Sequence, residues 1–108
     1  MTATPAPLIP RDREAIKAFV ADKLYDGESA RWRWPLAREP AGYCGWVNAK
    51  NRMGAYVGWR LYYVFYLSGA GGVKVLRARM TGDDDAETAK INSLCADDGY
   101  DISGPPPK

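Results

Sequence analysis

Residues Tyr43 to Leu67 read YCGWVNAKNRMGAYVGWRLYYVFYL, and this stretch decides the fold. Two runs with the alternation of β-strands, Tyr43–Asn48 and Ala55–Leu67, flank a polar turn at Ala49–Gly54. A turn this short joins neighbouring strands in opposite directions, because parallel strands need a crossover of a dozen or more residues. The stretch therefore predicts an antiparallel hairpin at the centre of a sheet.

The chain on either side of this hairpin predicts two more strands and two helices. Arg31–Leu36 alternates like a strand, and a glycine-rich turn at Ser68–Gly72 leads into a fourth strand at Val73–Met80. Helices are expected to start near Asp12 and near Asp84. We therefore expect an α+β fold, a four-stranded antiparallel meander flanked by an N-terminal and a C-terminal helix, with both helices on one face of the sheet.

Each predicted helix carries one apolar stripe at helical spacing. The stripe of the first helix consists of Ile16, Phe19, Val20 and Leu24, and that of the second consists of Ile91, Leu94 and Cys95. We expect Asp12 to cap the first helix and Gly27 to end it. Asp84, three residues before Glu87, fits the start of a capping box, and Gly99 is expected to end the second helix.

A chain of 108 residues with 46% hydrophobic and 26% charged residues has the length and composition of one globular domain. We expect a loose arm over residues 1–9, a single α+β domain over residues 10–102 and a disordered tail over residues 103–108. No run approaches the length of a membrane helix, and no secretory signal precedes the domain. The sequence therefore predicts a cytoplasmic protein that does not contact a membrane.

The chain contains no histidine, and this absence narrows the chemistry that it can perform. Ser-His and Cys-His nucleophile pairs, histidine acid–base catalysis and most transition-metal sites need that side chain. We therefore expect no enzyme activity, no metal and no cofactor; an enzyme that uses the thiol of Cys44 is the catalytic alternative. Cys44 and Cys95 are expected either as two buried thiols or as a disulfide that ties the central strands to the C-terminal helix.

The long strand at Ala55–Leu67 has two different faces, because successive side chains of a strand point to opposite sides. The face that we assign to the core consists of Ala55, Val57, Trp59, Leu61, Tyr63, Phe65 and Leu67. The opposite face consists of Tyr56, Gly58, Arg60, Tyr62, Val64 and Tyr66. Three tyrosines and an arginine are neither plainly apolar nor plainly solvated, so we expect this second face to be a binding surface.

Basic residues are concentrated in the strand region, where residues 31–79 contain nine basic residues and one acidic residue. Lys74, Arg77 and Arg79 are expected next to the tyrosine face. Aromatic rings beside cations suit single-stranded nucleic acid, and the same residue types are enriched at protein interfaces. A helix packed over the second face is the structural alternative. The polar hairpin tip, expected either as a plain turn or as part of the recognition surface, consists of Asn48, Lys50, Asn51 and Arg52.

The segment CGWVNAKNRMGAYVGW, preceded by ESARWRW, resembles a widespread group of small uncharacterised bacterial and phage proteins. The resemblance covers Ser29–Trp59, and Cys95 matches a later cysteine of the pattern. The pattern residues are Cys44, Gly45, Val47, Asn48, Lys50, Asn51, Gly54, Tyr56 and Gly58. Trp46 stands where an acidic residue is frequent in the group, and Ala55 replaces its second glycine. The resemblance implies no known reaction, and its secreted members keep the disulfide alternative open.

These observations predict a non-catalytic binding protein whose partner is a host protein or a ribonucleoprotein complex. Its small size, single domain and lack of catalytic groups suit an inhibitor of a bacterial defence complex, of the anti-CRISPR type, encoded by a phage or another mobile element. A single-stranded nucleic-acid-binding domain that uses the same tyrosine face is the alternative function.

Overall fold

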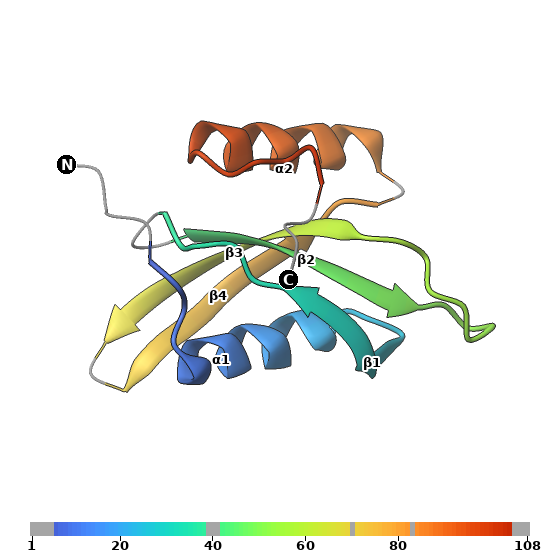
Figure 1. The fold of residues 1–108 in the computed structure, drawn as a ribbon, viewed down its shortest axis with the longest axis horizontal. Coiled ribbons are helices and arrows are strands. Elements are labelled where there is room, and N and C mark those ends of the chain that lie inside the picture. Colours follow the sequence, from blue (N-terminus) through green and yellow to red (C-terminus); the bar gives the residue numbers. More distant parts are fainter. Residues whose placement is uncertain (1–5, 39–41, 70, 83, 105–108) are drawn as a thin grey trace.

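The computed structural model describes residues 6–38, 42–69, 71–82 and 84–104, which form one antiparallel sheet and two helices (Figure 1). The elements in chain order are α1 (Pro10–Ala21), β1 (Asp26–Arg33), β2 (Gly42–Lys50), β3 (Arg60–Gly69), β4 (Gly72–Met80) and α2 (Asp85–Asp97). The strands lie in the order β1-β2-β3-β4, and each is antiparallel to the next. The predicted α-β-β-β-β-α meander is therefore confirmed.

The two helices lie on opposite faces of the sheet, whereas the sequence predicted both on one face. Figure 1 shows α2 above the sheet and α1 below it. α1 packs mainly on β4 and also on β1, while α2 packs on β3 and β4. The prediction was wrong because the middle of the sheet is apolar or aromatic on both sides, and each side needs a cover.

The N-terminal helix begins and ends earlier than its sequence signals suggested. Ile9 occupies the N-cap position without a side-chain hydrogen bond, so Asp12 does not cap the helix. Pro10 lies in the first turn, where the missing N–H costs nothing. The helix ends at Ala21, and Gly27, expected to end it, lies within β1.

Part of the predicted N-terminal arm belongs to the folded domain. The amide of Ala6 donates a 3.1 Å hydrogen bond to the Ala37 carbonyl, and the Ala37 amide donates one of 2.7 Å to the Ala6 carbonyl. Leu8 is buried in the core. Residues 6–9 are therefore not a loose arm. Residues 1–5 of that arm, residues 39–41 of the predicted loop and residues 105–108 of the predicted tail lie outside the described residues.

The connection between β2 and β3 is longer than predicted, and β3 begins at Arg60 instead of Ala55. Gly54 and Gly58 have φ angles of 81° and 103°, a region that residues with a side chain rarely adopt. Strand geometry cannot pass through these two positions. The run from Ala55 to Trp59 therefore forms a loop, although its sequence alternates like a strand.

The C-terminal helix follows its predicted signals closely. The Asp84 carboxylate accepts a 3.1 Å hydrogen bond from the Glu87 amide, and Gly99 has a φ angle of 95° just after the helix. Ile91 and Cys95 are buried as predicted, but Leu94 is exposed. The helix therefore covers its side of the sheet with a narrow apolar stripe.

Candidate binding surfaces

The tyrosine face that the sequence proposed as a binding surface lies mostly inside the molecule. Tyr62 and Tyr66 belong to the buried core, together with Ile16 and Val20 of α1. The ring of Tyr62 makes edge contacts with Trp32 and packs obliquely against Tyr43. The structural alternative considered for this face, a helix packed over it, is therefore the correct one, and Tyr62 and Tyr66 cannot contact a partner.

Gly45 makes room for the buried Tyr62 ring. The two residues are directly opposite in the β2–β3 pairing, and a Cβ atom at Gly45 would collide with the Tyr62 hydroxyl and ring. Burial of Tyr62 raises its pKa well above the usual tyrosine value, because an ionised phenolate would lose its hydration. Gly45 and Tyr62 are a packing pair and not a site.

Arg60, also assigned to the tyrosine face, lies apart from the other predicted cations. Its side chain is half-buried and lines a shallow hollow with Leu24, Val47 and Met80. Leu24 follows α1 in the chain, and Met80 and Val47 lie on the side of the sheet that α1 covers. The sequence expectation that Arg60 lies beside Lys74, Arg77 and Arg79 is wrong, because these three residues lie on the α2 side.

Tyr56 is the one tyrosine of the predicted face that lies at the surface. Its hydroxyl donates a 2.9 Å hydrogen bond to the Ser29 carbonyl, which fixes the β2–β3 loop against β1. The Arg31 guanidinium lies 4.2 Å from the ring centroid, and the Lys50 ammonium lies 5.5 Å from it. Two cations therefore share one anchored ring.

A second stacked pair continues this arrangement. The Arg33 guanidinium lies 4.7 Å from the Trp59 ring centroid and donates a 3.1 Å hydrogen bond to the Trp32 carbonyl. We call the resulting group the edge cluster; its members are Arg31, Arg33, Lys50, Tyr56 and Trp59. The predicted binding residues did not include Arg31, Arg33 or Trp59. The alternation of RWRW nevertheless places the two arginines on the same side of a strand.

The asparagines of the hairpin tip use their side chains to build the loop. The Asn48 side-chain oxygen accepts a 2.9 Å hydrogen bond from the Gly58 amide. The Asn51 side-chain oxygen accepts hydrogen bonds of 2.9 Å and 3.2 Å from the amides of Met53 and Ala55. The tip was expected to be either a plain turn or part of a recognition surface. The side-chain oxygens of both asparagines are used to build the loop, which is the structural role. Arg52 is exposed beside them.

A different surface brings predicted cations together with exposed apolar side chains. A hollow of about 500 Å3 lies between α2 and the β3–β4 pair, and we call it the α2 groove. The groove is lined by Tyr63, Phe65, Leu76, Arg77, Arg79, Lys90, Ile91 and Leu94. Phe65, Leu76 and Leu94 are 40%, 45% and 41% exposed, which is unusual for large apolar side chains that gather in one place.

A β-bulge contributes to the shape of the groove. Phe65 pairs with Arg77 and Tyr66 pairs with Val75, so Leu76 has no direct partner across the strands. The extra residue changes the alternation of β4, and Leu76 lies on the α2 side beside Arg77. Sequence alternation alone does not reveal a bulge, so Leu76 and the groove were missed.

The cations of the α2 groove differ in their pairing. Arg79 forms a 2.9 Å ion pair with Glu87 of α2. No described carboxylate lies within ion-pair distance of Arg77 or Lys90. Lys74 lies near the start of β4, opposite the exposed Leu67. The groove therefore combines an apolar floor with two cations that have no ion-pair partner among the described residues.

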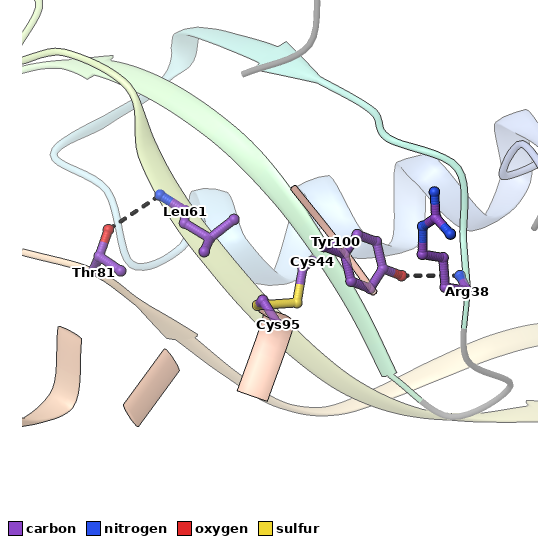
Figure 2. The surroundings of a disulfide bond; sticks show 6 residues. All are labelled: Arg38, Cys44, Leu61, Thr81, Cys95 and Tyr100. Atoms are coloured by element: carbon purple, nitrogen blue, oxygen red, sulfur yellow. Dashed lines mark hydrogen bonds between the residues drawn. A yellow bond between two sulfur atoms is a disulfide. The ribbon is translucent and has the colours of Figure 1, made fainter. Parts of the chain in front are cut away.

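A disulfide holds the helix that forms one wall of this groove. Figure 2 shows the bond between Cys44 of β2 and Cys95 of α2, which are 51 residues apart in the sequence. Both cysteines are completely buried. Nearby, the Arg38 amide donates a 3.1 Å hydrogen bond to the Tyr100 hydroxyl, which ties the segment after α2 to the chain after β1 (Figure 2). Of the two states left open for the cysteines, the structure contains the disulfide.

Two other features are absent from the described part of the chain. No group of three or more His, Cys, Asp or Glu side chains among these residues is placed to hold a metal ion. Neither described helix has the length and apolar character needed to cross a membrane.

Comparison of the chain with protein-family models, with curated protein sequences and with solved structures finds no significant match. The resemblance of Ser29–Trp59 to small bacterial and phage proteins therefore stays a prediction.

Proposed function

We propose that this protein is a non-catalytic binding protein that holds an acidic, apolar segment of a partner protein in the α2 groove. The observation that carries the proposal is the coincidence of exposed apolar side chains with unpaired cations. Leu76 and Leu94 offer apolar surface, and Arg77 and Lys90 lie in the same lining. A partner segment with leucine-like and carboxylate side chains would satisfy both features.

The state of the cysteines supports a role without catalysis. The catalytic alternative requires a free thiolate at Cys44, whereas Cys44 is bonded to Cys95 and completely buried. With no histidine in the chain, the common ways to activate a serine or threonine hydroxyl are also missing. Binding through a preformed groove needs neither group.

An inhibitor of a bacterial defence complex, of the anti-CRISPR type, is the narrower form of this proposal. It rests on the resemblance to phage and bacterial proteins and would place the protein in the cytoplasm. Disulfides are rare there, because cellular reductants keep thiols reduced. Exchange requires a thiolate to reach one of the sulfurs, and both cysteines are completely buried. Once formed, the bond would therefore be reduced slowly. The cytoplasmic location stays a prediction.

A position-specific cross-linking experiment tests the groove. A photo-reactive phenylalanine analogue is placed at Leu76 in one sample and at Leu36 in another, since these leucines are 45% and 46% exposed and Leu36 lies outside the groove. After illumination in a lysate of the natural host, we expect only the Leu76 sample to capture a discrete protein. The captured peptide should contain both acidic and large apolar residues. Equal capture from position 36, or a captured peptide without acidic residues, would contradict the proposal.

A charge-reversal pair identifies the contribution of the cations. Arg77→Glu with Lys90→Glu should reduce capture by at least about tenfold, because hydrogen bonds to charged groups contribute about 1.5–3 kcal/mol each. Arg11→Glu with Lys23→Glu changes the net charge equally, at exposed positions outside the groove. This control should capture the partner like the unmodified chain. A similar loss in both variants would show that net charge, and not the groove, attracts the partner.

A further inference from the structure

We propose that the edge cluster is a second binding site, which takes the phosphate backbone of a nucleic acid. The inference does not rest on the α2 groove or on a protein partner. It rests on three cations, Arg31, Arg33 and Lys50, that are held by aromatic rings on one face of the sheet edge.

The register of β1 and β2 places the three cations on the same side. Arg31 pairs with Asn48 and Arg33 pairs with Trp46, so both arginines face the side that carries the even-numbered residues of β2. Lys50 follows Asn48 by two residues and shares that side. Because β1 is an edge strand, no further strand covers this margin of the sheet.

Ring stacking orients the cations and leaves their donors available. A guanidinium has five N–H donors, so a contact between its central carbon and a ring leaves donors available for an anion. Arg33 donates one N–H to the Trp32 carbonyl. The Arg31 side chain donates no hydrogen bond to any described residue. The side chains are therefore partly ordered before an anion arrives, which lowers the entropic cost of binding.

Neighbouring carboxylates do not neutralise the edge cluster. None of the described acidic side chains forms an ion pair with Arg31, Arg33 or Lys50. Asp26 lies opposite Lys50 in the register and keeps its negative charge, but it forms no ion pair with that lysine. Three cations beside this one carboxylate leave a net positive charge among the described residues of the cluster.

The small amount of open apolar surface in the cluster favours a phosphodiester backbone over an acidic peptide with apolar side chains. Arg31 and Arg33 are two residues apart in β1, so their Cα atoms are separated by roughly 7 Å along the strand. Their rings, Tyr56 and Trp59, are covered by the cations, which leaves little ring surface for apolar peptide side chains or for stacked bases. Recognition through the cluster should therefore be independent of base sequence.

Salt dependence provides the direct test, because each phosphate contact releases counterions. Labelled single-stranded DNA, single-stranded RNA and duplex DNA are titrated with the full chain by fluorescence anisotropy. Three contacts predict a slope of log K against log salt of about −2 for a single strand, and an affinity loss of about 20-fold between about 50 mM and about 200 mM salt. The three probes distinguish which nucleic acid supplies the phosphates. No binding at the lower salt concentration would overturn the proposal.

Two charge-matched variants locate the contacts. Arg31→Gln with Arg33→Gln should reduce the slope to about −0.7, the value for one remaining contact. Arg77→Gln with Lys90→Gln removes the same charge from the α2 groove and should leave the slope unchanged. The opposite pattern, or equal effects of both variants, would overturn the assignment to the edge cluster. Arg31→Lys with Arg33→Lys should retain the slope, which separates lost charge from misfolding.

A measurement on the unmodified chain provides a second criterion. Nuclear magnetic resonance shifts on addition of the oligonucleotide should concentrate at residues 31–33 and 50–59 and be absent at Leu76 and Leu94. Polyglutamate at equal charge concentration should compete poorly. If it displaces the oligonucleotide as well as unlabelled DNA does, the cluster is a general polyanion surface and the proposal is wrong.

Discussion

At the scale of single residues, two tyrosines in the same aromatic cluster satisfy their hydroxyl groups differently. The Tyr43 hydroxyl donates a 2.6 Å hydrogen bond to the Pro35 carbonyl. The Tyr62 hydroxyl is buried and has no hydrogen-bond partner among the described residues. A buried polar group without a partner costs about 1–3 kcal/mol, whereas a formed hydrogen bond contributes about 1 kcal/mol. The two hydroxyl groups should therefore have opposite effects on stability.

Removing each hydroxyl tests this difference. Tyr43→Phe should lower the free energy of unfolding by about 1 kcal/mol, because the Pro35 carbonyl loses its donor. Tyr62→Phe should leave the free energy unchanged or raise it by up to about 1 kcal/mol, since no hydrogen bond is lost. Urea unfolding followed by tryptophan fluorescence measures both. If Tyr62→Phe is the more destabilising change, the Tyr62 hydroxyl has a partner and the interpretation is wrong.

Several residues on which the predicted resemblance rests have structural tasks in this chain. Cys44 forms the disulfide, Gly45 accommodates Tyr62, and Asn48 and Asn51 organise the β2–β3 loop. Tyr56 fixes that loop to β1. A pattern with these contacts can be explained by the fold alone, so it does not imply a shared reaction.

At the scale of elements, α2 combines a covalent bond with a narrow apolar contact to the sheet. Only Ile91 and Cys95 of this helix are buried. The Cys44–Cys95 bond closes a loop of 51 residues, for which the chain-entropy model gives a stabilisation of about 4 kcal/mol and typical measurements give about 2–4 kcal/mol. The bond is therefore expected to be a major restraint on the helix that forms a wall of the groove.

Replacing both cysteines tests the dependence of α2 on the bond. Cys44→Ala with Cys95→Ala should lower the free energy of unfolding by about 2–4 kcal/mol in urea titrations. Amide hydrogen exchange should increase more in residues 85–97 than in β2 and β3. The unmodified chain, unfolded and refolded with and without reductant, is the control. An unchanged unfolding midpoint and equal protection of α2 would show that packing alone holds the helix.

The sequence predicted the elements well because their signals are local. The Asp84 cap and Gly99 mark α2, and the alternation between Val73 and Met80 marks β4. The side of the sheet that each residue faces is not a local property. Leu61 to Leu67 is apolar or aromatic on both faces, so its alternation cannot show which face is buried, and the two helices decide. A loop glycine such as Gly58 ends the strand geometry of the backbone, while the sequence around it still alternates like a strand.

At the scale of the whole molecule, the placement of charge follows from helices on both faces. The sequence places nine basic residues in the strand region, which suggested one open basic face. Two helices on opposite faces leave neither face of the sheet fully open (Figure 1). The cations therefore gather in the edge cluster and in the α2 groove. The predicted single surface was wrong, because its residues are divided between the buried core, the edge cluster and the α2 groove; whether the exposed residues bind a partner stays a prediction.

The layer between α1 and the sheet also determines how the whole molecule responds to alkaline pH. Burial raises the pKa of the tyrosines in and beside this layer, and desolvation is the largest cause for each of them. The four residues are Tyr43, Tyr62, Tyr66 and Tyr100. In the unfolded chain a tyrosine ionises near pH 10, so above that pH the unfolded state binds fewer protons than the folded state. The stabilisation is complete below about pH 10 and is lost as pH rises toward the folded-state pKa values.

Urea unfolding at a series of pH values should show this loss. Each tyrosine that stays neutral in the folded state lowers the free energy of unfolding by up to about 1.4 kcal/mol per pH unit above about pH 10. Tyrosinate absorbance should rise in the same step as the loss of folded structure, because Tyr43 and Tyr62 ionise only after exposure. Tyr43→Phe with Tyr62→Phe should reduce the pH slope, while each variant keeps the same disulfide. If all tyrosines ionise while the fold stays intact, the aromatic layer between α1 and the sheet is open to water, and the buried assignment of Tyr62 fails.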